Sequence, residues 1–483
     1  MLSFKQTWRA GMLAALFGAV LLNGCAVGPD YVRPEMEVPA AFKEQWKGAE
    51  PRAELPRGPW WELFGDTELD RLVEQVEVSN QNIRAVEAQY RQARALAQQA
   101  RSEYFPLLTG DLGATRSRSA GNTGNGANAA SNYNTSYRAG LDASWEPDLW
   151  GRIQRSVESE VANVQASAAD IEAVKLSAQA ELAQNYFLLR IADARRQVLQ
   201  ETLAAYERSV QLTQNQYNVG VVALADVVAA KTQLKSTQAQ VVDVGVQRAQ
   251  LEHAIAVLIG KPPAEFSLPP SDAPVVLPPN IPTGMPSELL ERRPDIAAAE
   301  RRTAAANAQI GVAQAAYFPA LTLTGAFGYQ ASSFGNLFQS PSLFWSLGPA
   351  LAQTIFDGGF RKSVKAQALA AYDQNVANYR QTVLLSFQEV EDNLSTLRIL
   401  QEEAALQAEA VEAARKSVEI RRNQYKAGII DFLDVINTET IALNTQIAAL
   451  NIQSNRLSAA VLLIRALGGG WDAAALQQLP PVK

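Results

Sequence analysis

Polar and apolar side chains alternate along four stretches of the chain. In the clearest, 133–146, Tyr, Thr, Ala, Leu and Trp occupy every second position, and mostly polar residues lie between them. A looser alternation covers 104–118, and a second pair of such stretches lies within 317–357. Alternation over this length is typical of strands in a membrane barrel. The pattern predicts two β-hairpins, at 104–146 and 317–357, with a soluble hairpin packed on helices as the alternative.

A different period follows each hairpin. Residues of the predicted helix core recur at steps of three and four over 182–217 and again over 390–425. Sustained spacing of this kind predicts coiled-coil helices. At 1.5 Å per residue, an unbroken helix over 154–217 would be about 95 Å long. Shorter helices are expected before each strand pair, at 68–101 and 287–316.

Two glycines predict where the long helices end. The sequence Gln-Tyr-x-x-Gly ends at Gly220 and recurs at Gly428, and in both copies an Asp lies nine residues after the Tyr. The two tyrosines, Tyr217 and Tyr425, are 208 positions apart (425 − 217). This distance is far longer than the period of a solenoid repeat. The chain is therefore predicted to be internally duplicated, with one architecture in both halves.

The duplication gives a domain division. We expect a signal peptide at 1–24, an acylated N-terminal extended segment at 25–67, a first repeat at 68–260 with its helical hairpin at 150–260, a Pro-rich linker at 261–286, a second repeat at 287–468 with its helical hairpin at 359–468, and a C-terminal tail at 469–483.

The N-terminus resembles a lipoprotein signal. Basic residues precede an apolar run at 12–22 that is too short to span a bilayer. The run ends in Leu-Asn-Gly before Cys25, which is the only Cys in the chain, and this order resembles a bacterial lipobox. Ala26 follows, where an Asp would indicate inner-membrane retention. We expect a covalent lipid on Cys25 and outer-membrane placement, the alternative being a plain signal peptide with Cys25 incidental.

Composition excludes several function classes. The net charge of the 483 residues is −6, without a basic block, so no nucleic-acid partner is expected. One His and one Cys offer almost nothing for a metal site, and His253 reads as an ordinary helix residue. No nucleophile, base and orienting group recur together, so neither an enzyme nor a cofactor is expected. Outside the N-terminus no segment reads as apolar enough for a membrane helix, so any membrane crossing should use strands.

Four strands per chain cannot close a barrel, yet strand edges must be paired in lipid. Oligomerisation is therefore expected. Eight strands from a dimer would be filled by side chains, whereas twelve from a trimer leave room for a lumen. The polar strand face favours the trimer.

Several motifs in order resemble the outer-membrane efflux factor family, which is TolC-like, in its OprM/NodT lipoprotein branch. They are Cys-Ala-Val-Gly-Pro-Asp-Tyr-Val-Arg-Pro at 25–34, Trp-Trp-x-x-Phe at 60–64, Glu-Arg-Arg-Pro-Asp-Ile at 291–296 and Ala-x-Tyr-Phe-Pro at 315–319. The resemblance covers essentially the whole chain.

The resemblance implies a fold and partners. The fold would be mixed α and β: a homotrimer with a 12-stranded β-barrel in the Gram-negative outer membrane, continuous with a long periplasmic α-helical coiled-coil barrel. A periplasmic membrane-fusion adaptor and an inner-membrane transporter of the resistance-nodulation-division type would complete an efflux pump for drugs and other small molecules. Outer-membrane lipid would surround the barrel and hold the anchor.

The resemblance also places a gate at the periplasmic helix tips. Asp434 matches an Asp of a gate ring, the next ring position falls on Asn437, and Asp431 is the nearest competitor. A solvated tip carboxylate is the alternative for Asp434. Three carboxylates at a pore axis would favour cations.

Asp226 and Tyr425 match a pair that links the inner and outer helical hairpins in the shut state. A basic residue that the family can use in the same lock falls on Ile430. For Tyr217 and Tyr425, simple packing at a helix end is the alternative reading.

Two other functions are open at this level. The same architecture can serve as the exit duct of a protein-secretion exporter, which the lipobox and the Val-Gly-Pro after it disfavour. A periplasmic coiled-coil scaffold without a pore is the third hypothesis, and planar-bilayer conductance would separate it from both channels.

Overall fold

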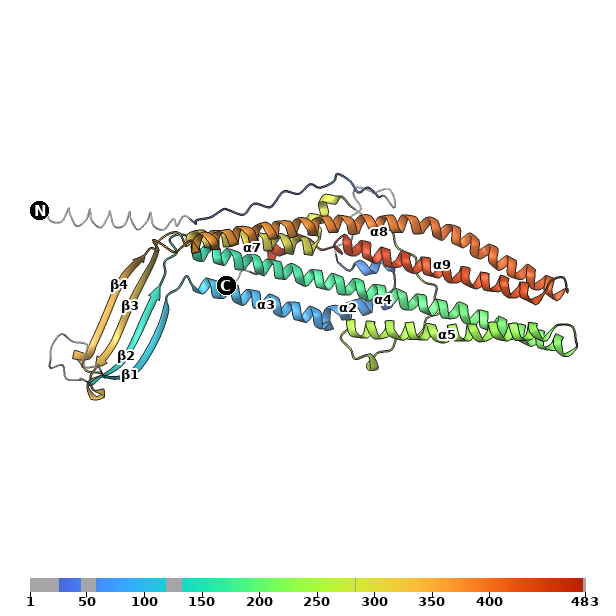
Figure 1. The fold of residues 1–483 in the computed structure, drawn as a ribbon, viewed down its shortest axis with the longest axis horizontal. Helices are drawn as coiled ribbons and strands as arrows, with labels where there is room; N and C mark the ends of the chain where they lie inside the picture. Colours follow the sequence, from blue (N-terminus) through green and yellow to red (C-terminus); the bar gives the residue numbers. More distant parts are fainter. Residues whose placement is uncertain (1–25, 45–57, 119–132, 283, 481–483) are drawn as a thin grey trace.

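The computed structural model describes residues 26–44, 58–118, 133–282 and 284–480. In this part of the chain, a sheet lies at one end of an elongated molecule and long helices run from it to the other end (Figure 1). Both the signal peptide predicted at 1–24 and the acylation site predicted at Cys25 lie outside the described residues. The elements are η1 (Trp60–Phe64), α2 (Thr67–Ser79), α3 (Gln81–Ser102), β1 (Leu107–Arg118), β2 (Tyr133–Trp145), α4 (Arg152–Asn218), α5 (Leu224–Leu258), η2 (Pro263–Glu265), η3 (Pro286–Glu288), α6 (Leu289–Arg292), α7 (Pro294–Ala315), β3 (Ala320–Ala331), η4 (Phe334–Asn336), η5 (Ser340–Ser342), β4 (Leu343–Ala352), α8 (Phe360–Lys426), α9 (Phe432–Ala466) and η6 (Ala473–Gln478).

The alternating stretches form one antiparallel sheet with the strand order β1-β2-β3-β4. The register places Leu141 opposite Phe327, and Phe327 opposite Trp345, so apolar side chains of neighbouring strands share one face. Arg138 and Asp142 lie on the other face and form a salt bridge of 3.0 Å. The predicted hairpins are confirmed. Because β1 and β4 are the outer strands, the described chain leaves two strand edges unpaired.

The long helices also form where the three–four spacing predicts them. Helices α4 and α8 have 67 residues each, about 100 Å at 1.5 Å per residue. Helices α5 and α9 have 35 residues each and return along α4 and α8, so that each pair is an antiparallel hairpin with its tip far from the sheet (Figure 1). Among the described helices, α9 alone is long and apolar enough by composition to cross a membrane. The sequence reading, which expected no such segment, was wrong on this point.

Two predicted helices are broken. The helix expected at 68–101 divides at Asn80, whose Oδ1 accepts hydrogen bonds from the backbone N–H groups of Asn82 and Ile83 and so starts a new helix. The helix expected at 287–316 divides before Pro294, which has no backbone N–H and takes the first position of α7. In both places a local stop signal prevails over the continuing periodicity.

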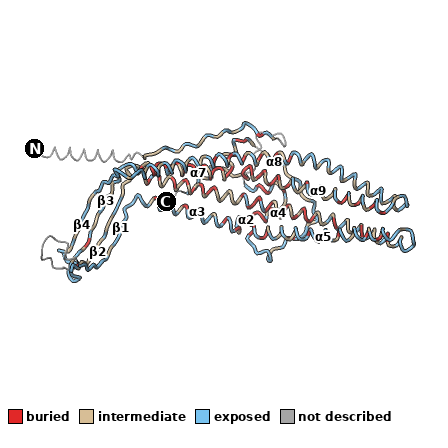
Figure 2. Tube along the Cα trace, in the orientation of Figure 1, coloured by how far each residue is buried: buried red, intermediate tan, exposed pale blue. Residues whose placement is uncertain are grey.

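The core lies at mid-length, where α2, α4, α8 and α9 meet, while both ends of the molecule are mostly exposed (Figure 2). Trp60 and Phe64 of η1 enter this core, and the Trp60 Nε1 donates to Gln179 Oε1 at 3.2 Å. Asp193 is buried beside it and pairs with Arg248 at 2.8 Å across the α4–α5 hairpin. These two contacts join η1 and α5 to α4 at the middle of the molecule.

The residues that follow Cys25 are fixed at the junction of sheet and helices. The Val27 N–H donates to the Trp150 carbonyl at 3.0 Å, and Asp30 pairs with buried Arg155 at 2.8 Å. From there the segment continues along α7 and α8 (Figure 1). Residues 26–30 therefore lie close to the helical end of the strands.

Candidate functional site: the paired helix tips

Both long helices end in the same backbone turn. At the first tip, Gly220 has φ 75°, the Gly220 N–H donates to the Tyr217 carbonyl and the Val221 N–H donates to the Gln216 carbonyl, both at 2.9 Å. This pair of hydrogen bonds defines the Schellman motif, and its left-handed residue is normally Gly. Gly428, with φ 72°, repeats both bonds at the second tip. The duplicated Gln-Tyr-x-x-Gly sequence is therefore a helix stop, as its glycines predicted.

Asp226 stabilises the start of the returning helix at the first tip. Its carboxylate accepts a hydrogen bond of 3.1 Å from the Ala223 N–H, one turn earlier. The positive end of the α5 dipole also favours a negative charge at this position. Asp226 thus has a local structural role in this chain.

Tyr425 joins the two hairpins, although not through the partner that the resemblance implied. Its hydroxyl donates to the Gln216 Oε1 of α4 at 2.6 Å, and its ring lies 5.3 Å from that of Phe432. Burial raises the pKa of Tyr425, and the nearby charge of Asp226 raises it further. In this chain Tyr425 bonds to Gln216, and Asp226, its counterpart in the pair that the resemblance implied, bonds to the Ala223 N–H instead.

Ile430 lies in an apolar cluster at the second tip. It packs with Tyr425, Phe432 and Val435 in a small apolar cluster that also includes Ala230 of the other hairpin. A charged side chain here would lose its hydration on entering this cluster. Apolar contact therefore occupies the place where the resemblance expects a charge.

The three residues proposed for the gate ring lie at the start of α9. Asp431 is the N-cap residue, Asp434 lies in the first turn and Asn437 follows one turn later. All three are exposed, whereas Phe432 and Val435 between them are buried. Residues three apart are neighbours on a helix surface. The chain therefore presents two carboxylates and an amide together at an exposed helix start.

Several polar residues near the tips were not predicted. Gln216 belongs to the duplicated motif, so the motif itself was the available signal. Arg422 and Glu439 form an ion pair of 2.6 Å across the second hairpin. Both positions lie equally far from the turn at 430–431, so opposite charges at matched distances were a usable signal. Gln233 and Thr440, which connect different hairpins, gave none.

Known proteins resemble this chain over nearly its whole length. Residues 72–261 and 285–469 match the outer membrane efflux protein family. Outer membrane protein OprJ of Pseudomonas aeruginosa is 32% identical, over 95% of this chain and 96% of its own. The pyoverdine export outer membrane protein OpmQ of the same organism is 29% identical, over 95% and 97%.

A solved structure extends the likeness to the fold. The outer-membrane channel OprN has a TM-score of 0.85 and 34% identity, covering 92% of this chain and 100% of its own. Sequence match, long helical hairpins and a four-stranded sheet agree. The chain belongs to the outer membrane efflux protein family.

Proposed function

We propose that this protein is the outer-membrane channel of a tripartite efflux pump, through which drugs and other small molecules leave a Gram-negative cell. The observation that carries the proposal is a sheet with one continuous apolar face, attached directly to helices about 100 Å long. A conduit that crosses the outer membrane and the periplasm needs both parts. A relative named for pyoverdine export supports a small-molecule cargo. Nothing is transformed along such a path, so no enzymatic step or cofactor is required.

Three chains would complete the barrel. The unpaired edges of β1 and β4 would bind neighbouring chains, giving twelve strands around a lumen. The face with Arg138 and Asp142 would then line the lumen and the face with Leu141 and Trp345 would meet lipid. The helical hairpins of three chains would continue the barrel as a periplasmic tube.

A lipid on Cys25 would hold the N-terminus at the membrane. The support is the position of the residues just after it, since Val27 is bonded to Trp150 at the end of the strands that would meet the periplasmic leaflet. Each buried CH₂ of an acyl chain contributes roughly 0.8 kcal/mol. Barrel strands alone would keep the protein in the membrane without it.

The helix tips would be the gate and would meet the adaptor of an inner-membrane resistance-nodulation-division transporter. Asp434 with Asp431, and with Asn437 one turn away, would form a ring around the axis that favours cations. The Tyr425–Gln216 bond would hold the hairpins together in the shut state, with Asp226 beside it. Their opening would pass the cargo.

The test is to purify the full chain in detergent and record its mass and conductance. Native mass spectrometry should show a trimer, with each mature chain beginning at a lipidated Cys25. In planar bilayers the trimer should conduct ions. A stable monomer that forms no channel would refute the proposal, whereas Cys25→Ser with a functional signal peptide should still give trimers.

A further inference from the structure

A second polar contact joins the two helical hairpins above the tips. The Nε2 group of Gln233, on α5, donates to the Tyr206 hydroxyl of α4 at 3.2 Å and to the Thr440 hydroxyl of α9 at 3.3 Å. Tyr206 is only 3% exposed. One amide therefore connects three helices, and its bond to Thr440 crosses from the first hairpin to the second.

Thr440 is suited to this acceptor role. Its hydroxyl hydrogen is already donated to the Ile436 carbonyl at 2.8 Å, which leaves the oxygen lone pairs for Gln233. The amide supplies two N–H groups, one for each hydroxyl. Both Gln233 bonds thus have a suitable donor and acceptor, and none of the three groups is charged.

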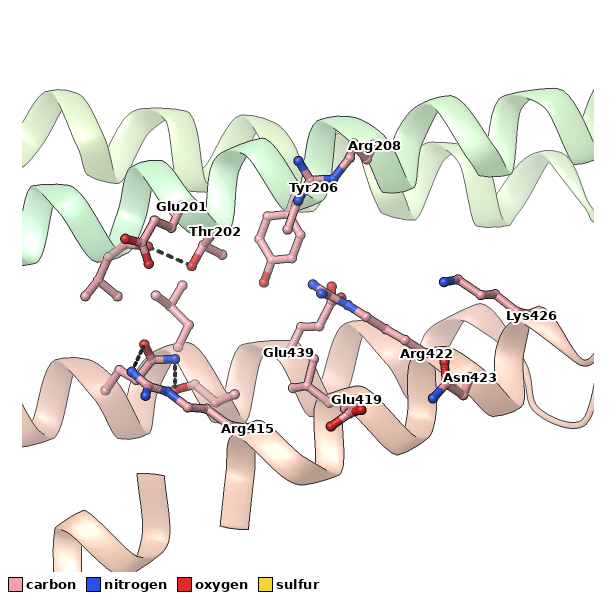
Figure 3. A pocket seen from close by; sticks show the side chains of 16 residues that line it. Glu201, Thr202, Tyr206, Arg208, Arg415, Glu419, Arg422, Asn423, Lys426 and Glu439 are labelled. Carbon is pink, nitrogen blue, oxygen red and sulfur yellow. Dashed lines mark hydrogen bonds and ion pairs between the residues drawn. The ribbon is translucent and has the colours of Figure 1, made fainter. Parts of the chain in front are cut away.

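A cavity of about 660 Å³ lies beside this contact, between α4 and the α8–α9 hairpin (Figure 3). Tyr206 and Arg208 face it from α4, and Arg422, Lys426 and Glu439 face it from the other hairpin. Close packing is what usually holds helices together. The cavity interrupts this packing between α4 and the α8–α9 hairpin, while apolar clusters around Leu443 on one side and Val435 on the other still join the hairpins. Polar bonds at this level therefore add to an incomplete apolar contact.

An ion pair, Glu439 with Arg422, lies beside the cavity. Glu439 is 5% exposed, its Oε1 pairs with Arg422 at 2.6 Å, and its Oε2 has no hydrogen-bond partner among the described residues. Both partners belong to the second hairpin, so their ion pair does not join it to the first. Among the described residues, the polar link between hairpins at this height is the Gln233–Thr440 bond.

We propose that Tyr206, Gln233 and Thr440 form a second latch between the hairpins, which holds the gate shut together with the Tyr425–Gln216 bond. The latch compensates for the apolar Ile430, where no basic residue is present to lock the tip. This inference rests on the proposed channel function. Gln233 is its central residue, because losing that side chain removes both bonds.

The test measures the ratio of open to closed states in planar bilayers for the full chain. Gln233→Leu keeps the size of the side chain and removes the amide. Loss of one neutral hydrogen bond shifts such a ratio by roughly fivefold per chain. Gln233→Leu should therefore raise the open-to-closed ratio at least roughly fivefold. Gln238→Leu is the matched control on α5, because among the described residues the Gln238 side chain bonds to Lys235 of the same helix and to none of the second hairpin. It should gate like the wild type.

Thr440→Val and Tyr206→Phe resolve the contact further. Thr440→Val should raise the open-to-closed ratio roughly fivefold. Thr232→Val is its control, since Thr232 makes the same hydrogen bond to the carbonyl four residues earlier but does not cross between hairpins. Tyr206→Phe should change the ratio less, because that bond lies within one hairpin. Combining Gln233→Leu with Thr440→Val should add little to Gln233→Leu alone, since Gln233→Leu already removes the bond that Thr440→Val would remove.

The outcomes separate this latch from the channel itself. If Gln233→Leu and Thr440→Val gate like the wild type while trimer melting is unchanged, the latch does not exist. Equal effects from the two control variants would also overturn it. If Gln233→Leu does not assemble, Thr440→Val and Tyr206→Phe decide. If neither the wild type nor the double variant Gln216→Leu with Tyr425→Phe conducts ions, the proposed function itself is rejected.

Discussion

The two helix tips have the same backbone turn and different surroundings. At the second tip Phe432 is 3% exposed and Tyr425 bonds to the other hairpin. At the first tip the corresponding residues, Leu224 and Tyr217, are 55% and 39% exposed. Duplication kept the residues that stop the helix, while the side chains around the turn diverged. The second tip thus holds the hairpins together, and the first leaves an apolar surface exposed.

The matched carboxylates differ in the same way. Asp226 accepts a hydrogen bond from the Ala223 N–H, whereas Asp434 has no side-chain hydrogen bond among the described residues. Asp226 thus bonds the backbone N–H of the N-cap residue Ala223, whose own side chain cannot cap the helix. At the second tip Asp434 is exposed and available for a partner chain or an ion.

The largest difference between the tips should come from truncating their apolar residues. Phe432→Ala removes a buried ring and should lower the free energy of local opening by about 3 kcal/mol. Leu224→Ala, at the matched exposed position, should change it by less than about 0.5 kcal/mol. Hydrogen exchange of the tip amides, read by mass spectrometry, measures both. Equal losses would contradict the comparison.

The turn glycines should show no difference. Gly220→Ala and Gly428→Ala both place a Cβ at positive φ, which costs about 1–2 kcal/mol. An added Cβ meets no atom within 4 Å at either site, so the cost is conformational alone. Hydrogen exchange at each tip should give matching losses. A clearly larger loss at one tip would show that the turns are not equivalent.

The tyrosine hydroxyls should differ by a smaller amount. Tyr425→Phe removes the bond to Gln216 and should destabilise contact between the hairpins by about 1 kcal/mol. Tyr217→Phe removes a hydroxyl that has no side-chain bond among the described residues, so it serves as the control. The double variant Tyr425→Phe with Gln216→Leu should lose no more than the single one. A loss from Tyr217→Phe as large as that from Tyr425→Phe would refute the assignment.

The smallest expected effect depends on pH. Burial raises the pKa of Glu439 above 4.5, against the opposing charge of Arg422. An acid whose pKa is raised on folding stabilises the fold most below its unfolded pKa, and that stability is lost as pH rises through the folded pKa. Tyr206, Arg208, Lys426 and Glu419 also face the cavity. Burial raises the pKa of Tyr206 further above neutrality, whereas it moves that of Glu439 toward neutrality.

Thermal melting at pH 5 and pH 8 tests this effect. The wild type should lose melting temperature relative to Glu439→Gln as pH rises, because only the wild type ionises at that position. Parallel pH curves for the two proteins would contradict the assignment to Glu439.

Periodicity predicted the long helices and the strands because a period of two or 3.6 repeats many times in each. It failed at Asn80 and Pro294, where one residue ends a helix by its own hydrogen bonding or lack of it. The apolar composition of α9 was also underestimated. Single residues of this kind are visible in a sequence, but their effect is averaged out by a long pattern.

The site was predicted less completely than the fold. Gly220 and Gly428 could be placed because a left-handed turn needs glycine. The partner of Tyr425 could not, because Gln216 is 209 residues away in sequence and the pairing depends on how two hairpins meet. The gate ring at Asp431, Asp434 and Asn437 stays a prediction.

The most direct test compares the single-channel conductance of the wild type with that of the double variant Gln216→Leu with Tyr425→Phe. The wild type should conduct weakly because its tips are held together. It should prefer cations because of the carboxylates at those tips. The double variant should conduct more and admit large antibiotics such as vancomycin into cells, with unchanged trimer yield. Equal conductance at equal trimer yield would show that contact between the two tips does not close this channel.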